Sequence, residues 1–471
     1  MRICMIFEGS YPYVRGGVSS WAHDYISSMS EHEFVLWTIA SEQSQQGQFK
    51  YELPENVVEV REIFLDQSLE ADKKSYRPVR LSRAQMDGLE ELLSGGDPDW
   101  KSMMEDFQKN PYPPAQILQS PGLMTVVQKL CSEQYSTMPF SDFFHMVRSL
   151  LLPVIWMMES EIPEADCYHT ISTGYAGILG ALASYQKEKA LILTEHGIYT
   201  REREEELIGA NWCAPEFRQN FINLFYSISR LVYARSSAVT SLFQAASVTQ
   251  QEHGCLPEKC MVIPNGVNVE HLRQVSQKKM DQWFDIGAIV RFAPIKDIKT
   301  LLYSFYELRC RYSDVRLHIL GGVDDEEYAR QCYQLAETLQ LDKEHLIIPG
   351  FVKTAEYLPK LDVTVLTSLS EGQPLSVLES LAAACPCVTT RVGCCEELLG
   401  QGEEACGLVV PPMNPDLFCQ ALEWMYRHPE ERREMGLRGR QKVWDVYRHD
   451  QMVAGYQSMY DKVMRDGRNR I

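Results

Sequence analysis

The stretch Ser368-Leu-Ser-Glu-Gly-Gln-Pro-Leu-Ser-Val-Leu-Glu-Ser-Leu-Ala382 decides how the second half of the chain folds. Residues 361–366, just before it, form a short β-branched run typical of a buried parallel strand. Pro374 is typical of a first helical turn, so the stretch predicts a strand, a loop with Glu371 and a helix with Glu379. Such a helix start presents free backbone N–H groups and a positive dipole end, which suit a phosphate. The predicted phosphate-binding residues are Gly372, Gln373, Pro374 and Leu375.

The same alternation of apolar runs and helical spacing occurs twice along the chain. Predicted strands of the first set are 2–8, 33–40, 57–64, 165–171, 190–195, 238–240 and 260–263. Those of the second set are 285–291, 316–320, 346–348, 363–365, 386–389 and 407–410. This order predicts two Rossmann-like, doubly wound α/β domains, in which ligands bind at the carboxyl ends of the strands.

The predicted domains are residues 1–278 and 279–449, with a polar boundary near 275–282, and a final helix at 450–471 that crosses back to the first domain. Residues 66–161 break the α/β rhythm. They are helical in pattern, and prolines divide them into short pieces, so we expect an insertion of packed helices in the first domain. Its Trp, Met and Phe residues are interpreted as core.

The amino-acid composition argues against several classes of function. The 471 residues are ample for two or three domains, and a net charge of −18 argues against nucleic-acid binding and against unaided adhesion to anionic lipid. The N-terminal apolar run is too short for a signal peptide, and residues 149–158 are too few to span a bilayer. The fourteen cysteines are scattered, so we expect reduced thiols in a cytoplasmic protein.

Two features of the first domain are candidates for binding. Gly16-Gly17, in the loop after the first strand, lets backbone approach an anion closely, although a plain tight turn explains it equally well. His196 directly follows the strand 190–195, where active-site groups collect. It is either a hydrogen-bonding group for a ligand hydroxyl or carbonyl, or a satisfied structural histidine.

In the second domain, Arg291 and Lys296 leave one strand end five positions apart. Arginine grips two phosphate oxygens and lysine adds a point charge, so both residues suit a diphosphate. The alternative, two solvated surface cations, is weakened by the nearby Glu371-x7-Glu379 motif. Asp324 and Asp325 are interpreted as helix caps, and the cysteines 385, 387, 394 and 395 lack a usual zinc spacing, so no metal site is predicted.

Together these segments resemble glycosyltransferase family 4, the retaining enzymes of the GT-B fold. The segments are the Glu371-x7-Glu379 stretch, Arg291 with Lys296, Pro264-Asn-Gly-Val and Gly16-Gly17. Residues 8–21, 194–202, 294–298 and 370–374 are further similar to the glycosyltransferases of Pel-type polysaccharide synthesis. Val290 departs from the family, which often has glycine there, and Gln373-Pro374 replaces an aromatic-glycine pair.

The resemblance implies a UDP-sugar donor bound in a cleft between two facing domains, with the acceptor on the side of the first domain, and no metal or other cofactor. Arg291, Lys296 and the N–H groups near Gly16, Gly17 and Pro374 would neutralise the leaving diphosphate. By the same resemblance, Glu379 would hold the ribose hydroxyls and Glu371 those of the donor sugar.

His196 would contact the donor sugar near its 6-position, and no protein nucleophile is assigned. The two glutamates, which first suggest acid–base chemistry, are thus interpreted as hydroxyl-binding anchors.

The expected function is transfer of a hexose or N-acetylhexosamine to a growing exopolysaccharide, with a membrane protein as partner for export. Two alternatives stay open. One is a GT-B relative of other specificity, such as a synthase-type transferase or a sugar-nucleotide epimerase. The other is a non-catalytic subunit that binds the nucleotide for a membrane synthase, although a scaffold has no need of all four of Arg291, Lys296, Glu371 and Glu379.

Overall fold

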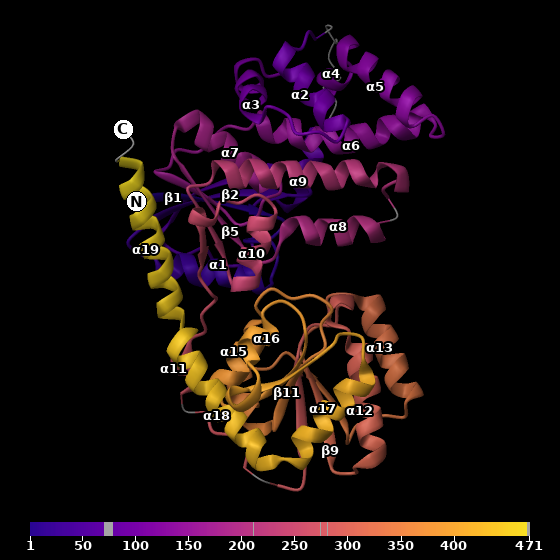
Figure 1. Ribbon diagram of the computed structural model, residues 1–471, viewed down its shortest axis with the longest axis vertical. Coiled ribbons are helices and arrows are strands. Elements are labelled where there is room, and N and C mark those ends of the chain that lie inside the picture. The colour runs from indigo at the N-terminus through magenta and orange to yellow at the C-terminus, as the bar shows by residue number, and fades with distance from the viewer. Residues whose placement is uncertain (70–78, 211, 274, 280, 469–471) are drawn as a thin grey trace. The chain divides into compact units, whose positions relative to one another are not determined.

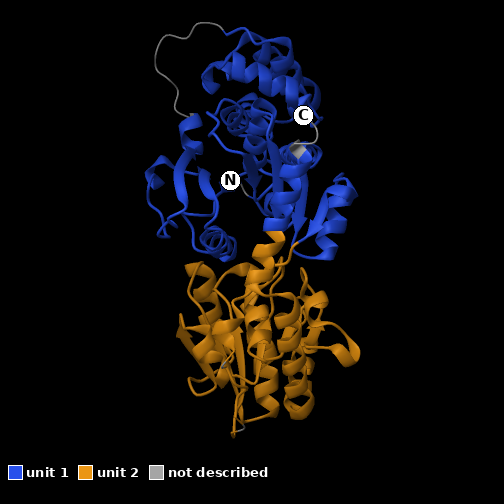
Figure 2. Ribbon diagram, turned by 90° about the vertical axis from the view of Figure 1, so that its left-hand side faces the viewer, with its two compact units in different colours: residues 1–262, 457–471 blue, residues 263–456 orange. Residues whose placement is uncertain are grey.

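The computed structural model describes residues 1–69, 79–210, 212–273, 275–279 and 281–468. The chain forms two compact units (Figure 2). Unit 1 comprises Met1–Val262 with Gln457–Ile471, and unit 2 comprises Ile263–Tyr456.

Unit 1 is built on a seven-stranded parallel sheet in the order β3-β2-β1-β4-β5-β6-β7. Because the chain moves outward from β1 in one direction and from β4 in the other, the strand order reverses between these two neighbours. Such a reversal is where doubly wound sheets place their ligands. The strands are β1 (Arg2–Glu8), β2 (Glu33–Ala40), β3 (Val57–Phe64), β4 (Cys167–Thr170), β5 (Ala190–Glu195), β6 (Ala238–Ser241) and β7 (Cys260–Val262).

Helices cover this sheet, and five more form the predicted insertion, stacked beyond α7 and α9 (Figure 1). The insertion is tied to the sheet domain by Trp100, whose indole N–H donates to Ser227 Oγ at 3.0 Å, and its apolar side chains are buried in the core of unit 1. The sheet-covering helices are α1 (Gly17–Ser28), α7 (Tyr175–Lys187), α8 (Tyr199–Gly209), α9 (Arg218–Arg235) and α10 (Gln244–Glu252). The inserted helices are α2 (Arg83–Leu93), α3 (Trp100–Lys109), α4 (Pro114–Leu118), α5 (Pro121–Gln134) and α6 (Phe140–Met158).

Unit 2 repeats the plan with a six-stranded parallel sheet in the order β10-β9-β8-β11-β12-β13. The predicted fold class, two Rossmann-like sheets with a helical insertion in the first, is therefore confirmed. The strands are β8 (Phe284–Ile289), β9 (Val315–Leu320), β10 (Leu346–Gly350), β11 (Val363–Leu366), β12 (Cys387–Thr390) and β13 (Gly407–Val410). The helices are α11 (Val269–Leu272), α12 (Ile298–Arg311), α13 (Glu326–Thr338), α14 (Thr354–Tyr357), α15 (Leu375–Ala382), α16 (Cys395–Leu399), α17 (Pro415–Arg427) and α18 (Pro429–Val446).

The boundary between the units lies at Val262/Ile263 and not at the predicted 278/279. The Pro264-Asn-Gly-Val turn already belongs to unit 2. The backbone N–H of Asn265 donates to Gln373 Oε1 at 2.6 Å, and Val267 bridges to Arg448. These contacts join positions far apart in the sequence, so the polar composition of residues 275–282 gave no indication of them.

The last helix, α19 (His449–Arg468), belongs to both units. Its residues up to Tyr456 are part of unit 2 and those from Gln457 are part of unit 1. In unit 1 the buried Tyr460 hydroxyl lies 2.6 Å from His169 Nδ1 on β4 and 2.6 Å from the Tyr25 hydroxyl on α1. The helix is thus held against the unit 1 sheet by buried polar contacts.

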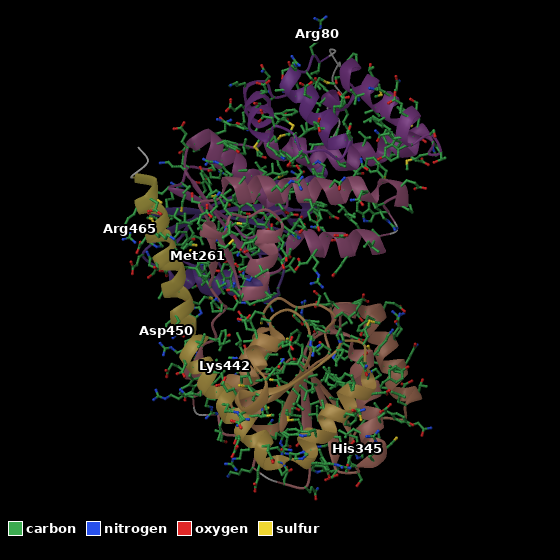
Figure 3. The ribbon with its side chains drawn as sticks, viewed as in Figure 1. Arg80, Met261, His345, Lys442, Asp450 and Arg465 are labelled. Carbon is green, nitrogen blue, oxygen red and sulfur yellow. The ribbon has the colours of Figure 1, made fainter. Side chains whose placement is uncertain are left out.

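Within unit 2, Lys442 on α18 fixes the helix that follows β12 (Figure 3). Its ammonium group donates to the carbonyl oxygens of Glu397 and Leu398 on α16, at 2.7 and 2.9 Å. A cation at the carboxyl end of a helix is favourable because it offsets the negative end of the dipole. Across the described ranges, we find no helix with the length and apolar character needed to span a bilayer.

Candidate active site

The clearest candidate group in unit 2 is an ion pair between Lys296 and Glu371. Lys296 follows β8, and Glu371 lies in the loop after the adjacent β11, so both are at the carboxyl edge of the sheet. Lys296 Nζ is 2.5 Å from Glu371 Oε1, and the two side chains are 18% and 12% exposed. The Ser368 hydroxyl donates to the same carboxylate oxygen at 2.6 Å. The structure thus brings together two residues predicted for one site.

The two loops that carry this pair are bonded to each other through their backbones. The N–H of Leu369 donates to the carbonyl of Ile295 at 2.8 Å, and the Thr367 hydroxyl donates to the carbonyl of Lys296 at 3.0 Å. These bonds fix the separation of the two charged side chains. The pair is therefore preorganised by its surroundings and does not depend on its own attraction alone.

The turn after Glu371 depends on a glycine elsewhere. Gly393 has φ +51°, and a Cβ there would lie 2.2 Å from the carbonyl oxygen of Gly372 and 2.3 Å from that of Glu371. The next N–H, of Cys394, donates to Gly372 O at 3.0 Å. Only glycine allows both the left-handed conformation and this close approach.

The other predicted cation, Arg291, does not join Lys296. Its guanidinium is paired with Asp324, and both side chains are substantially exposed. Asp324 was predicted to cap the next helix, and this prediction is wrong. Its carboxylate pairs with Arg291 instead. The cap of α13 is Asp325, whose carboxylate accepts from the N–H of Tyr328 at 2.8 Å.

The helix α15 begins at Leu375, with Pro374 as its N-cap and no side-chain hydrogen bond to that cap. No side chain of the described residues therefore occupies the N–H groups at the very start of the helix, and their binding of an anion stays a prediction. The side chain of Gln373 is 7% exposed and accepts from the Asn265 N–H at 2.6 Å. The amide oxygen of that side chain holds the Pro264–Val267 turn in place and is therefore not free for a ligand.

Glu379 lies in the second turn of α15, largely buried. Burial raises the pKa of its carboxyl, and a hydrogen bond with Thr354 partly opposes that rise. The described residues contain no group of three or more His, Cys, Asp or Glu side chains arranged to hold a metal ion.

In unit 1 the predicted residues occupy the carboxyl edge of the other sheet. His196 follows β5 and packs its ring edge-on against Trp21 of α1, with ring centroids 4.4 Å apart. Burial lowers the pKa of His196 to about 4, so the ring is neutral at physiological pH. Its Nε2 is buried and has no hydrogen-bond partner among the described protein atoms. A buried nitrogen without a partner distinguishes His196 from a structural histidine whose hydrogen bonds are satisfied.

Gly16 and Gly17 lie at the start of α1. Gly16 has extended backbone angles and is the N-cap, with no side chain capping the helix. A Cβ added to either residue would meet no heavy atom within 4 Å. The space beside this helix start is therefore open to a ligand, although the backbone angles of Gly16 do not themselves require glycine.

Sequence reasoning missed a charged cluster at the end of β1. Glu8 accepts from the Tyr199 hydroxyl at 2.8 Å, from Arg203 Nη2 at 3.3 Å and from the Ala176 N–H at the start of α7 at 3.1 Å. Arg203 also donates to Glu206 at 2.6 Å. The only sequence signal was the position of Glu8, as the last residue of a strand.

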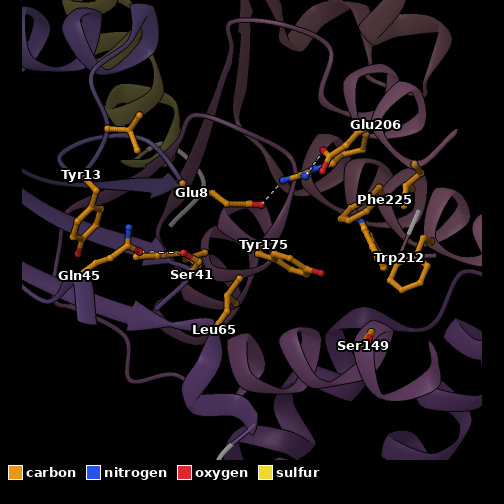
Figure 4. A pocket seen from close by; sticks show the side chains of 17 residues that line it. Glu8, Tyr13, Ser41, Gln45, Leu65, Ser149, Tyr175, Glu206, Trp212 and Phe225 are labelled. Atoms are coloured by element: carbon orange, nitrogen blue, oxygen red, sulfur yellow. Dashed lines mark hydrogen bonds and ion pairs between the residues drawn. The ribbon is translucent and has the colours of Figure 1, made fainter. Parts of the chain in front are cut away.

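This cluster lines a cavity of about 350 Å³ (Figure 4). Figure 4 shows Tyr175 across the middle of the cavity and Phe225 with Trp212 on one side. Most of its wall is aromatic or apolar, and a few polar groups are placed on it, as in pockets for small molecules. The lining comprises Glu8, Gly9, Tyr13, Val14, Ile39, Ala40, Ser41, Gln45, Leu65, Ser149, Tyr175, Arg203, Glu206, Leu207, Trp212, Phe221 and Phe225.

Each half of the chain matches a known protein family. Residues 1–258, more than half of the 471, match the family described as "Domain of unknown function (DUF3492)". The chain belongs to the DUF3492 family. Residues 268–442 match "Glycosyl transferases group 1", so the unit 2 part of this DUF3492 protein is a domain of that type.

Among curated proteins, the chain is similar to the MMP alpha-(1->4)-mannosyltransferase of Mycolicibacterium hassiacum, at 24% identity over 58% of this chain. It is also similar to the N-acetyl-alpha-D-glucosaminyl L-malate synthase of Bacillus anthracis, at 28% identity over 38% of this chain. The match spans 66% and 46% of the lengths of these two relatives.

A solved structure of Anabaena HepE in complex with UDP matches with a TM-score of 0.62 at 13% identity. The match covers 98% of this chain and 100% of that one. The DUF3492 protein therefore has the fold of GT-B glycosyltransferases.

Proposed function

We propose that the protein is a retaining glycosyltransferase that transfers a hexose or N-acetylhexosamine from a UDP-sugar to a growing exopolysaccharide. The observation that carries this proposal is the preorganised Lys296–Glu371 pair beside the uncapped start of α15. A cation, open N–H groups and a carboxylate at one strand edge are the groups needed to hold a diphosphate and a sugar hydroxyl. The relatives named above, two enzymes of sugar transfer and a UDP complex, support the same assignment.

On the donor side, Lys296 and Arg291 of unit 2 neutralise the departing diphosphate together with the N–H groups at the start of α15. In unit 1, the N–H groups near Gly16 and Gly17 are assigned to anion binding by resemblance. Stabilising a leaving group in this way is electrostatic and assigns no role to a metal. Addition of a chelator is therefore expected to leave the rate of transfer unchanged.

The two glutamates would bind the hydroxyls of the donor, Glu379 those of the ribose and Glu371 those of the sugar. Burial raises the pKa of Glu379, and its carboxyl oxygens can accept hydrogen bonds from the two ribose hydroxyls. His196 is assigned to a sugar hydroxyl near the 6-position, and its uncommitted Nε2 supports this role. The acceptor hydroxyl attacks the face that the diphosphate leaves, so the anomeric configuration is kept.

The acceptor site is assigned to unit 1, in the cavity shown in Figure 4. The aromatic rings of Tyr175, Trp212 and Phe225 offer apolar faces to the C–H face of a sugar, and Glu8 with Arg203 offers polar groups to its hydroxyls. A cytoplasmic enzyme that builds an exported polymer needs a membrane-embedded partner. Co-purification from the native host without any membrane protein would count against that partner.

The test is a titration panel followed by product analysis. We expect the full chain to bind UDP, UDP-glucose, UDP-N-acetylglucosamine or UDP-N-acetylgalactosamine more tightly than the ADP and GDP counterparts. Lys296→Ala and Glu379→Ala should remove transfer while the fold is kept. NMR of the product should show the donor's anomeric configuration.

Three outcomes would contradict the proposal. Wild-type turnover in either variant would overturn the residue assignment. Binding of UDP-sugars without transfer to any glycan would favour a non-catalytic subunit. An epimerised sugar nucleotide as product would favour an epimerase.

A further inference from the structure

Glu195, the last residue of β5, is a buried carboxyl group that lacks a cation. Its residue surface is 2% exposed, and in the described ranges no lysine or arginine is paired with it. The ionisable groups that act on it from neighbouring elements are Glu202 on α8, Tyr233 on α9 and the thiol of Cys255 before β7. A buried carboxyl without a counter-charge is costly, so its hydrogen bonds must compensate.

Three donors from three different helices converge on this carboxyl group. The Tyr233 hydroxyl of α9 donates to Oε2 at 2.8 Å, and the Gln250 amide of α10 donates to the same oxygen at 2.9 Å. The N–H of Tyr199, the first residue of α8, donates to Oε1 at 3.4 Å. One side chain thus joins the end of a strand to three helices.

The segment between Glu195 and Tyr199 contains His196, Gly197 and Ile198. Both ends of this short segment are fixed by the same carboxyl group, one covalently and one by the hydrogen bond to Tyr199. The imidazole of His196, one residue on, packs against Trp21 and keeps an uncommitted Nε2. Its position therefore depends on the bonds that Glu195 makes.

We propose that Glu195 is a positioning residue that holds His196 in place for the reaction by accepting these three hydrogen bonds in its ionised form. The inference rests on the proposed function of the site. A carboxylate can accept all three bonds, but a protonated carboxyl needs an acceptor for its own hydrogen. The Oε1 of Gln250 is buried without a partner and becomes that acceptor if the amide turns round. Protonation of Glu195 therefore replaces the bond from Gln250 on Oε2. It also weakens the bond that Oε1 accepts from the Tyr199 N–H of α8, because a neutral carboxyl is a weaker acceptor than a carboxylate.

Burial raises the pKa of Glu195 to about 7, against the lowering effect of the bonds from Gln250, Tyr233 and Tyr199. The switch between the two forms thus falls in an accessible pH range. Transfer by the wild type should fall as the pH decreases through about 7. Glu195→Gln mimics the protonated form and should lack this limb of the profile.

The matched control is Glu159→Gln. Glu159, at the carboxyl end of α6, is also a carboxyl whose pKa burial raises to about 7, and it too accepts a backbone N–H, from Tyr112 at 2.9 Å. It lies in the helical insertion, outside the candidate site. A general effect of removing a buried carboxyl would therefore appear in both variants, whereas positioning of His196 would appear only in Glu195→Gln.

We expect Glu195→Gln to lower kcat at least tenfold at pH 8 and less than threefold at pH 6, where the wild type is itself protonated. In a His196→Ala background the same change should cause no further loss. Hydrogen exchange measured by mass spectrometry at pH 8 should be faster in residues 196–203 of Glu195→Gln and unchanged there in Glu159→Gln.

Unchanged exchange in residues 196–203 of Glu195→Gln would overturn the inference, and so would an equal loss of kcat with or without His196. Absence of transfer in the wild type, with the exchange result as expected, would instead contradict the proposed function and leave the tie between Glu195 and this segment established.

Discussion

Replacing Lys296 by methionine would separate two effects of its ammonium group. Nζ is 2.5 Å from Glu371 Oε1, and neither side chain is more than 18% exposed. Methionine keeps most of the apolar stem and deletes the charge. A hydrogen bond to a charged group contributes roughly 1.5–3 kcal/mol, so we expect the free energy of unfolding of unit 2 to fall by about this amount. For a unit of this size the fall corresponds to a Tm decrease of roughly 3–12 °C.

The second variant adds Glu371→Gln. With both charges removed, no unpaired carboxylate is left at this partly buried position, so most of the lost stability should return. Transfer should not return, because the cation expected to face the leaving diphosphate is still absent. Loss of one preorganised electrostatic group of this kind lowers kcat by about 10²–10³. Stability is measured by calorimetry, and kcat by release of the nucleoside diphosphate.

Lys299→Met, three positions further along the chain in the first turn of α12, serves as the control for loss of a nearby cation. Lys299 Nζ donates to Gln331 Oε1 at 2.7 Å and lies over the Tyr328 ring, away from Glu371. That variant should keep wild-type kcat within about twofold, as expected for a substitution outside the reacting groups. If kcat recovers together with Tm in the double variant, Lys296 is only a structural tie for Glu371, and the reasoning is refuted.

Three further predictions follow from individual contacts. Asp324→Asn frees Arg291, and because an exposed pair contributes roughly 0.2–1 kcal/mol, UDP should bind up to about fivefold more tightly by calorimetric titration. Gly393→Ala should weaken UDP binding, because the added Cβ meets the carbonyl oxygen of Gly372. It should also lower the free energy of unfolding, measured by denaturation, by about 1–3 kcal/mol or more. The control Gly402→Ala, with φ +64° and no heavy atom within 4 Å of its Cβ, should lower it only by the strain of its backbone angle. Asp285→Asn should lower the free energy of unfolding of unit 2 by roughly 3–5 kcal/mol at neutral pH. Denaturation at a series of pH values measures this effect.

The pH dependence of the Asp285 effect has a definite sign. Burial opposes ionisation of this carboxyl, but hydrogen bonds from His318, Arg316 and Lys278 outweigh it and hold the pKa well below its usual range. The stabilisation is therefore complete above pH values near 4, the unfolded pKa, and is lost as the pH falls below them. The wild type and Asp285→Asn should thus converge in stability at strongly acidic pH. A difference that stays constant down to pH 2 would contradict this account.

The strands could be predicted from the sequence because each is a buried, near-continuous apolar run. β1 (Arg2–Glu8) and β11 (Val363–Leu366) follow such runs closely, since parallel strands in a doubly wound sheet are covered on both faces. The domain boundary could not be predicted in the same way. It depends on the hydrogen bond from Asn265 to Gln373, which joins residues 108 positions apart. The composition of the residues near the boundary does not predict such a long-range contact.

The sequence predicted which loops carry the candidate residues, but it did not predict the hydrogen-bond and ion-pair partners of those residues. Spacing placed Lys296 and Glu371 each after a predicted strand. It did not indicate that these two strands are neighbours or that the two side chains bond directly. Spacing likewise gave capping roles to both Asp324 and Asp325, and the structure confirms only that of Asp325. Glu8 was only part of a resembling segment and was given no role, because a single glutamate at the end of a strand has no spacing to distinguish it from a solvent-facing residue.

These partners bear on how a donor would bind. Each cation predicted for the diphosphate already holds a carboxylate, Lys296 with Glu371 and Arg291 with Asp324. An anion that binds there must share or displace those carboxylates, so the intrinsic attraction for the diphosphate is reduced by the free energy of each pair. The reduction is small for the exposed pair with Asp324 and larger for the enclosed pair with Glu371. Displacement by the diphosphate gives a new role only to Glu371, because its carboxylate, once released from Lys296, becomes available to the hydroxyls of the donor sugar. If the proposed function holds, diphosphate binding and sugar recognition are coupled through one ion pair. A free diphosphate should then gain less binding energy from Lys296 than a complete nucleotide sugar does.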